Sequence, residues 1–123
     1  MSKTNEKQRK KCVTLAKRIA VRSAGGSCEH CGRSKLMGYV MHGSHVYPEG
    51  RYKGMSADSD NILCLCFQCH FLWWHKHPLE ASEWFREKWP DRAETLKLRA
   101  REIRIINWND KHEALKAEEA KLP

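Results

Sequence analysis

The sequence lacks any long hydrophobic run and has little material for a core. Of its 123 residues, 41% are hydrophobic and 31% are charged, and no apolar segment approaches the roughly 20 residues that cross a bilayer. Residues 1–11 are charged and polar, without the apolar stretch of a signal peptide. We therefore expect no membrane partner and a cytoplasmic location. We also expect a small domain whose hydrophobic core is too small to fold it without added stabilisation by disulfides or a metal.

In a reducing compartment, paired cysteines are more often metal ligands than disulfides. Four of the six cysteines form two Cys-x-x-Cys pairs with identical spacing: Cys28, Cys31, Cys66 and Cys69. Two intervening residues let a tight turn direct both thiolates at one ion, so the two pairs predict a structural, tetrahedral Zn²⁺ site. The alternatives are two disulfides or four buried thiols. Cys12 and Cys64 break this spacing and are expected in the core.

The basic excess is concentrated at the N-terminus. The net charge is +8, and residues 1–24 hold eight Lys/Arg against one Glu, whereas residues 25–80 are neutral overall. Such a segment suits a phosphate-binding arm, although a solubilising leader gives the same composition. The candidate nucleic-acid contacts lie on one face of an N-terminal helix and in the loop 48–60: Lys7, Lys11, Arg18, Arg22, Arg51 and Lys53.

Hydrophobic periodicity and turn residues predict the order of elements. Apolar residues at three- and four-residue spacing define a helix over 4–24, and Pro78 suits the first turn of another. The expected elements are a helix at 4–24, strands at 39–45 and 61–65, a short helix at 71–74, helices at 78–88 and 92–106 (the latter capped by Asp91 with Glu94), and an exposed or frayed helix at 113–121. This pattern indicates three regions: a basic arm at 1–24, a zinc-stapled core at 25–78 and a helical extension at 79–123.

Histidines and one asparagine occur in a fixed order around the cysteine pairs. His45 ends a strand within His45-Val46-Tyr47-Pro48, Asn61 begins Asn61-Ile62-Leu63-Cys64-Leu65-Cys66, and His70 follows Cys69 directly. With both cysteine pairs, this order resembles the HNH endonucleases, the zinc-supported branch of the ββα-metal superfamily. The resemblance covers residues 26–78, and 78–80 with 84–85 look like small phage HNH proteins, including NinG-like recombination nucleases. It implies an α+β fold with a treble-clef-like ββα-metal core, in a bacterial or phage-infected cell.

The resemblance also implies roles for the polar residues. His45 would be the general base, with its second ring nitrogen held by a carbonyl, and His70 would bind Mg²⁺ or another divalent metal. Asn61 would either bind that metal or brace the loop that carries His45. Many family members place a further ligand directly before the base, where this chain has Ser44. His42, brought round by a bulge near Gly43, and His75, five residues after His70, are the other candidates.

The implied activity is hydrolysis of phosphodiester bonds in DNA, which leaves 5′-phosphate and 3′-hydroxyl ends. One such motif would nick one strand, so cleavage of both would need a homodimer or two encounters by a monomer. The alternative is a non-catalytic zinc module that binds DNA or a protein, which would need the cysteines but not His45, Asn61 and His70. A redox role for Cys-x-x-Cys is disfavoured because no thioredoxin-like βαβ pattern is present. His30, inside the first pair, is interpreted as an exposed bystander.

Overall fold

Helix α1 (Lys3–Ser23) is the longest element in the computed structural model, which describes residues 2–123. It begins where the Ser2 hydroxyl accepts a hydrogen bond from the backbone N–H of Asn5, and it is followed by Gly25 and Gly26 at φ 67° and 71°. Only glycine adopts such positive φ values readily, so this pair stops the helix. The predicted apolar stripe is buried along its length.

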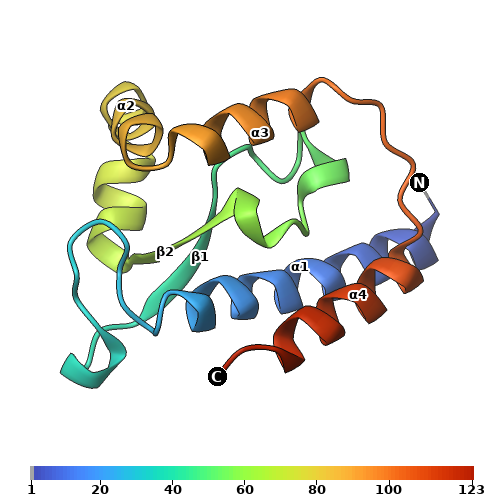
Figure 1. Cartoon of the computed structure of the whole chain (residues 1–123), viewed down its shortest axis with the longest axis horizontal. Helices are drawn as coiled ribbons and strands as arrows, with labels where there is room; N and C mark the ends of the chain where they lie inside the picture. The colour runs from blue at the N-terminus through green and yellow to red at the C-terminus, as the bar shows by residue number, and fades with distance from the viewer. Residues whose placement is uncertain (1) are drawn as a thin grey trace.

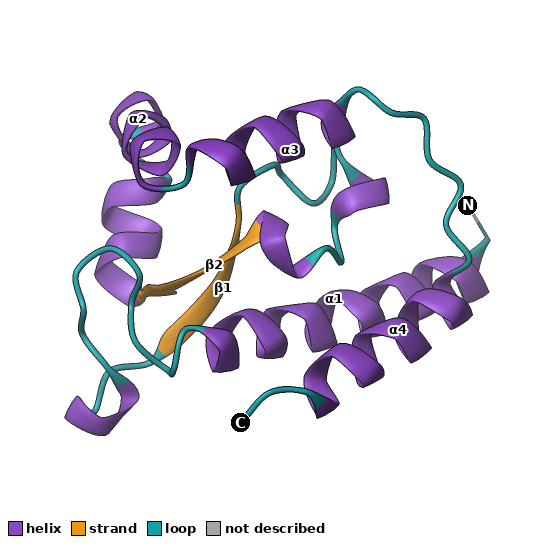
Figure 2. Cartoon of the chain, in the orientation of Figure 1, coloured by secondary structure: helices purple, strands orange, loops and turns teal. Residues whose placement is uncertain are grey.

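A two-stranded antiparallel sheet lies beside α1 (Figures 1 and 2). Strands β1 (Met41–His45) and β2 (Ile62–Cys66) pair in an unbroken register from Met41 opposite Cys66 to His45 opposite Ile62. The bulge proposed near Gly43 is therefore absent, and β1 begins two residues later than predicted. Every residue of β2 is buried, because α1 contacts the sheet and the other helices close around it.

Three helical elements follow the sheet. A π-helix spans Gln68–Trp74, α2 spans Pro78–Lys88 as predicted, and α3 spans Pro90–Ala100. The predicted helix at 92–106 is wrong at both ends: it begins at Pro90 without a side-chain cap and stops at Ala100. In the segment after α3, the Arg104 guanidinium donates to the buried Asp58 carboxylate at 2.9 Å, which ties this segment to the loop between β1 and β2.

Helix α4 spans Trp108–Ala120 and is packed against the domain, so the prediction of an exposed or frayed helix at 113–121 was wrong. The Asn107 side chain caps it by accepting from the N–H groups of Asn109 and Asp110, and Trp108 and Leu115 are buried. Figure 1 shows α4 lying along α1, although the two are at opposite ends of the sequence. Within residues 2–123, no helix is both long and apolar enough to cross a membrane.

The buried residues form two clusters. The helix-pair core lies between α1 and α4 and includes Cys12, Leu15, Ala16, Ile19, Ile62, Trp108 and Leu115. The cysteine-side core lies between β2, α2, α3 and the first cysteine pair and includes Cys28, Met55, Leu63, Leu65, Cys66, Cys69, Phe85 and Leu96. Strand β2 contributes to both, so the fold is a small α+β unit with two cores joined through one strand.

Candidate metal centre and histidine cleft

The two Cys-x-x-Cys pairs converge. The Sγ atoms of Cys28, Cys31, Cys66 and Cys69 all lie within 4.8 Å of one another, and none is in a disulfide. The Sγ atoms of Cys31 and Cys66 are 3.6 Å apart, whereas tetrahedral zinc with its usual bond length places sulfur atoms about 3.8 Å apart. Four thiols in this arrangement fit a structural zinc ion. Cys12 and Cys64 are fully buried elsewhere, as predicted for core residues.

Hydrogen bonds of Glu29 fix the first cysteine pair to the sheet. Glu29 donates its N–H to the Cys64 carbonyl at 2.8 Å, and its carboxylate accepts from the Cys64 N–H at 2.9 Å. Burial alone would raise the pKa of the Cys66 thiol, but hydrogen bonds from the Cys69 N–H, Cys31 and Arg33 outweigh it and lower the pKa to about 7. Burial is the largest cause that raises the pKa of Cys31 and of Cys69, so the thiolate form that zinc binds is favoured at Cys66 and disfavoured at those two thiols.

His30 is exposed but is not a bystander. Its Nδ1 lies 3.2 Å from the Sγ atom of Cys69, and its ring stacks on Trp73 with centroids 3.6 Å apart. The expectation from sequence was therefore wrong: His30 supports one of the sulfur ligands and links it to the π-helix.

His45 stands at the end of β1 with one ring nitrogen anchored. Its Nε2 lies 2.7 Å from the carbonyl oxygen of Ser56, as expected for a base held in one tautomer. A carbonyl only accepts hydrogen bonds, so Nε2 carries the proton of the neutral ring and Nδ1 keeps a free lone pair. Burial, with lesser contributions from the charges of Lys17 and Arg9, lowers the pKa of His45 below its ordinary value despite the Ser56 carbonyl and Glu49.

Asn61 acts as a brace. It is 0% exposed, its Oδ1 accepts from the Tyr47 N–H at 2.9 Å, and its Nδ2 donates to the carbonyls of Tyr47 and Met55. These contacts tie the chain after His45 to the segment that precedes Ser56. Of the two roles considered for Asn61, the structure shows bracing, and its amide oxygen is occupied by the backbone rather than offered to a metal.

The π-helix explains a spacing that an α-helix does not. His75 donates its N–H to the His70 carbonyl at 3.2 Å, the i to i+5 bond of a π-turn. Residues five apart therefore become neighbours, and the rings of His70 and His75 lie 4.8 Å apart between centroids. Burial, then the charges of His75, His42, Lys17 and His45, lower the pKa of His70 to about 4. It is therefore neutral near pH 7, as a metal ligand must be.

His42 also reaches His70. Their Nδ1 atoms are 3.1 Å apart, an N–H···N hydrogen bond. Two imidazole nitrogens that share one divalent ion lie about 3.0–3.4 Å apart at ordinary bond lengths, so this pair is at the separation of two ligands, and an ion would have to displace the proton that they share. The register reaches this arrangement without a bulge. Ser44, by contrast, is buried, and its hydroxyl has no hydrogen-bond partner within residues 2–123.

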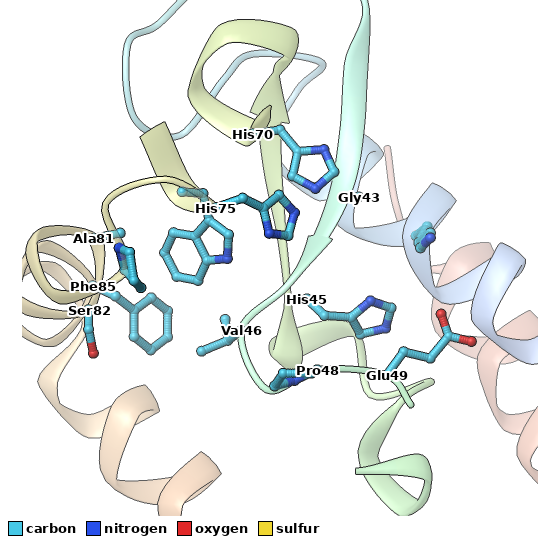
Figure 3. Close-up of a pocket in the computed structure, with 13 residues that line it drawn as sticks. Gly43, His45, Val46, Pro48, Glu49, His70, His75, Ala81, Ser82 and Phe85 are labelled. Atoms are coloured by element: carbon cyan, nitrogen blue, oxygen red, sulfur yellow. The ribbon is translucent and has the colours of Figure 1, made fainter. Parts of the chain in front are cut away.

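His45 and His70 face one cleft of about 530 Å³ between β1, the π-helix, α2 and α1 (Figure 3). His75 lines the same space, and Figure 3 shows its ring beside that of His70, with His45 at the end of the strand and Glu49 beyond it. The cleft therefore combines an anchored imidazole that has a free lone pair with two further imidazoles, those of His70 and His75. That combination suits general base and metal-assisted chemistry.

The residues predicted to contact nucleic acid differ in whether the structure holds them in ion pairs. Arg18 forms two hydrogen bonds with the Glu119 carboxylate at 2.6 and 2.9 Å, and Arg22 approaches the same carboxylate at 3.4 Å. Helix α4 thus pairs these two arginines with an acidic residue, which the sequence did not reveal, while both side chains stay exposed. Lys7, Lys11 and Arg51 are exposed without an ion pair in the described chain, and Lys53 lies 3.9 Å from Glu6.

Arg9 belongs to the basic segment but is a buried residue, 3% exposed. It bonds to Glu6, to Glu49 at 3.0 Å and to the Ser56 hydroxyl at 3.2 Å, so it supports the residue whose carbonyl holds His45. Its position three residues before Cys12 extends the apolar stripe, and this periodicity could have identified it. Lys17, on the flank of the stripe, lines the cleft and was also missed.

Comparison of the chain with protein-family models, with curated proteins and with solved structures gave no match. Its function is therefore argued from the geometry of the site.

Proposed function

We propose that the chain is a metal-dependent DNA endonuclease of the HNH type, with a ββα-metal core stapled by structural zinc. The observation that carries the proposal is the cleft shared by His45 and His70, in which the Nε2 atom of His45 lies 2.7 Å from the Ser56 carbonyl. The proposal is supported by the order of β1, β2 and the π-helix along the chain and by the four converging cysteines beside them.

In this proposal His45 is the general base. Its Nδ1 accepts a proton from a water molecule while the oxygen of that water attacks the phosphorus of a DNA phosphodiester. The bond from phosphorus to the 3′ oxygen breaks, the 3′ oxygen takes a proton from solvent, and the products are a 3′-hydroxyl and a 5′-phosphate. Neutral His45 is the active form, which its lowered pKa favours at neutral pH.

His70 with His42 would hold a divalent ion, and His75 stands beside them as a further donor. Such an ion supplies positive charge to the phosphate and to the leaving oxygen. Imidazole nitrogen suits transition-metal ions better than Mg²⁺, which prefers oxygen and would keep most of its waters at this site. Asn61 contributes by bracing the loop, since its amide is engaged by Tyr47 and Met55.

Plasmid nicking tests the proposal. Wild-type protein with zinc bound is expected to convert supercoiled to open-circular DNA with Mg²⁺ or Mn²⁺, and His45→Ala should be slower by about 10²–10⁴-fold, the usual contribution of a general base. His112→Ala, on α4 away from the cleft, is the matched control and should nick like wild type.

Zinc-loaded protein that nicks no DNA with either ion would contradict the nuclease proposal. Binding of DNA without cleavage would instead identify a non-catalytic zinc module.

A further inference from the structure

Lys17 is the cationic side chain of the histidine cleft. It lies on α1 four residues after Val13 and three before Ala20, both buried, so it sits on the flank of the helix that faces the sheet. It lines the cleft together with His45 and His70. Within residues 2–123, the ion pairs and side-chain hydrogen bonds include none from Lys17, and Glu49, the acid of the same cleft, is bonded to Arg9.

Gly43 holds the Lys17 side chain at this place. A Cβ atom on residue 43 would lie 2.6 Å from the Cγ and 2.7 Å from the Cβ of Lys17, closer than real Cβ contacts. The stem of Lys17 therefore passes directly over β1, two residues before His45, and only glycine leaves room for it. This close approach fixes the stem of Lys17 against the strand that carries the general base.

Lys17 brings a positive charge to a cleft that His45 and His70 also line. Its side chain is only partly exposed, and its stem is held against β1 by the close approach at Gly43. A half-buried ammonium beside two imidazoles, with no carboxylate as partner, favours an anion in the space between them. The anion that belongs in a phosphodiesterase cleft is the phosphate to be cleaved.

We propose that Lys17 binds a non-bridging oxygen of the scissile phosphodiester between His45 and His70 and stabilises the negative charge that develops there during attack. The inference deepens the proposed nuclease function and rests on it for the reaction, whereas the phosphate contact can be measured by binding alone. It gives α1 a direct part in the site, because the helix then supplies a substrate ligand as well as a core.

The test compares Lys17→Met, which keeps the stem over Gly43 and removes the charge, with Lys17→Arg, which keeps the charge. Lys121→Met, at the exposed end of α4, removes one charge far from the cleft and is the control. In single-turnover cleavage at saturating DNA, Lys17→Met should be slower by about 10²–10³-fold, as for removal of one donor to a developing anion, and Lys17→Arg should recover most of the rate. Thermal melting and zinc content should be unchanged.

Binding separates this inference from the nuclease proposal. In a His45→Ala background, with zinc retained and no added divalent ion, affinity for a labelled DNA duplex is measured as a function of KCl concentration. Lys17→Met should reduce the slope of log affinity against log salt by about 0.9, the effect of one phosphate contact, and Lys121→Met should not. An unchanged slope in Lys17→Met overturns the inference whether or not the protein cleaves DNA, and absence of cleavage by wild type with a reduced slope overturns only the nuclease proposal.

Discussion

The two cores of this molecule are built by different means. The helix-pair core uses one long helix, α1, whose apolar stripe is covered by α4. The cysteine-side core joins short elements, including the five residues of β2 and the seven of the π-helix, around four converging sulfur atoms. The histidine cleft lies where the two meet, since Lys17 comes from α1 and His70 from the π-helix. Apolar burial therefore stabilises one side of the site, and metal coordination is expected to stabilise the other.

Loss of zinc should have the largest effect and should strike the cysteine-side core. Zinc contributes about 10–16 kcal/mol to the folding of small zinc domains, as much as the whole stability of a typical domain. Cys69→Ser should therefore lose zinc and unfold the region around the π-helix, seen as loss of bound metal and of near-ultraviolet circular dichroism from Trp73 and Trp84. Cys64→Ala, buried in the same core but outside the cluster, should keep a full equivalent of zinc. Native melting of a zinc-free Cys69→Ser protein would show that coordination does not hold this core.

A cavity in the helix-pair core should have a smaller effect and leave zinc in place. Leu115 is 1% exposed on the face of α4 that packs against α1. Leu115→Ala should lower the free energy of unfolding by about 2–5 kcal/mol, measured by urea denaturation. Leu98→Ala, at a position 54% exposed on α3, makes the same chemical change with little effect. Zinc release from folded Leu115→Ala protein would mean that the two cores are not separable.

Local signals predicted the parts of the fold that depend on neighbouring residues. The spacing of the cysteine pairs identified the four sulfur atoms that converge, and Pro78 marked the start of α2. The periodic stripe located α1 to within one residue at either end. Each of these signals depends only on residues that are close together in the sequence, so each can be recognised without knowledge of the fold.

The rest depends on contacts between distant segments. The helix predicted at 92–106 stops at Ala100; beyond it Ile103 is fully exposed and Arg104 is paired with Asp58. Burial of α4 depends on its packing against α1, about a hundred residues away, and the same contact pairs the exposed Arg18 with Glu119. A π-helix has no pattern of its own in the sequence, so His75 was a candidate ligand whose five-residue spacing from His70 had no structural explanation until the π-turn was seen.

The smallest predicted effect is a shift in the pH dependence of the cleavage rate. It tests the surroundings of His45, to which both cores contribute charged groups. The groups that face His45 come from both sides: Glu49 from the loop after β1, Lys17 and Arg9 from α1, and His70 from the π-helix. The pKa of His45 is lowered from 6.5, the ordinary value for histidine, and the neutral ring is the base. The cleavage rate should therefore decrease on acidification only at pH values below 6.5. Glu49 raises that pKa, so Glu49→Gln should move the acid limb to still lower pH, whereas Glu113→Gln on α4 should leave it in place. Rates measured from pH 5 to 8 at saturating metal check both, and an acid limb above the ordinary histidine value would contradict a base buried between α1 and the sheet.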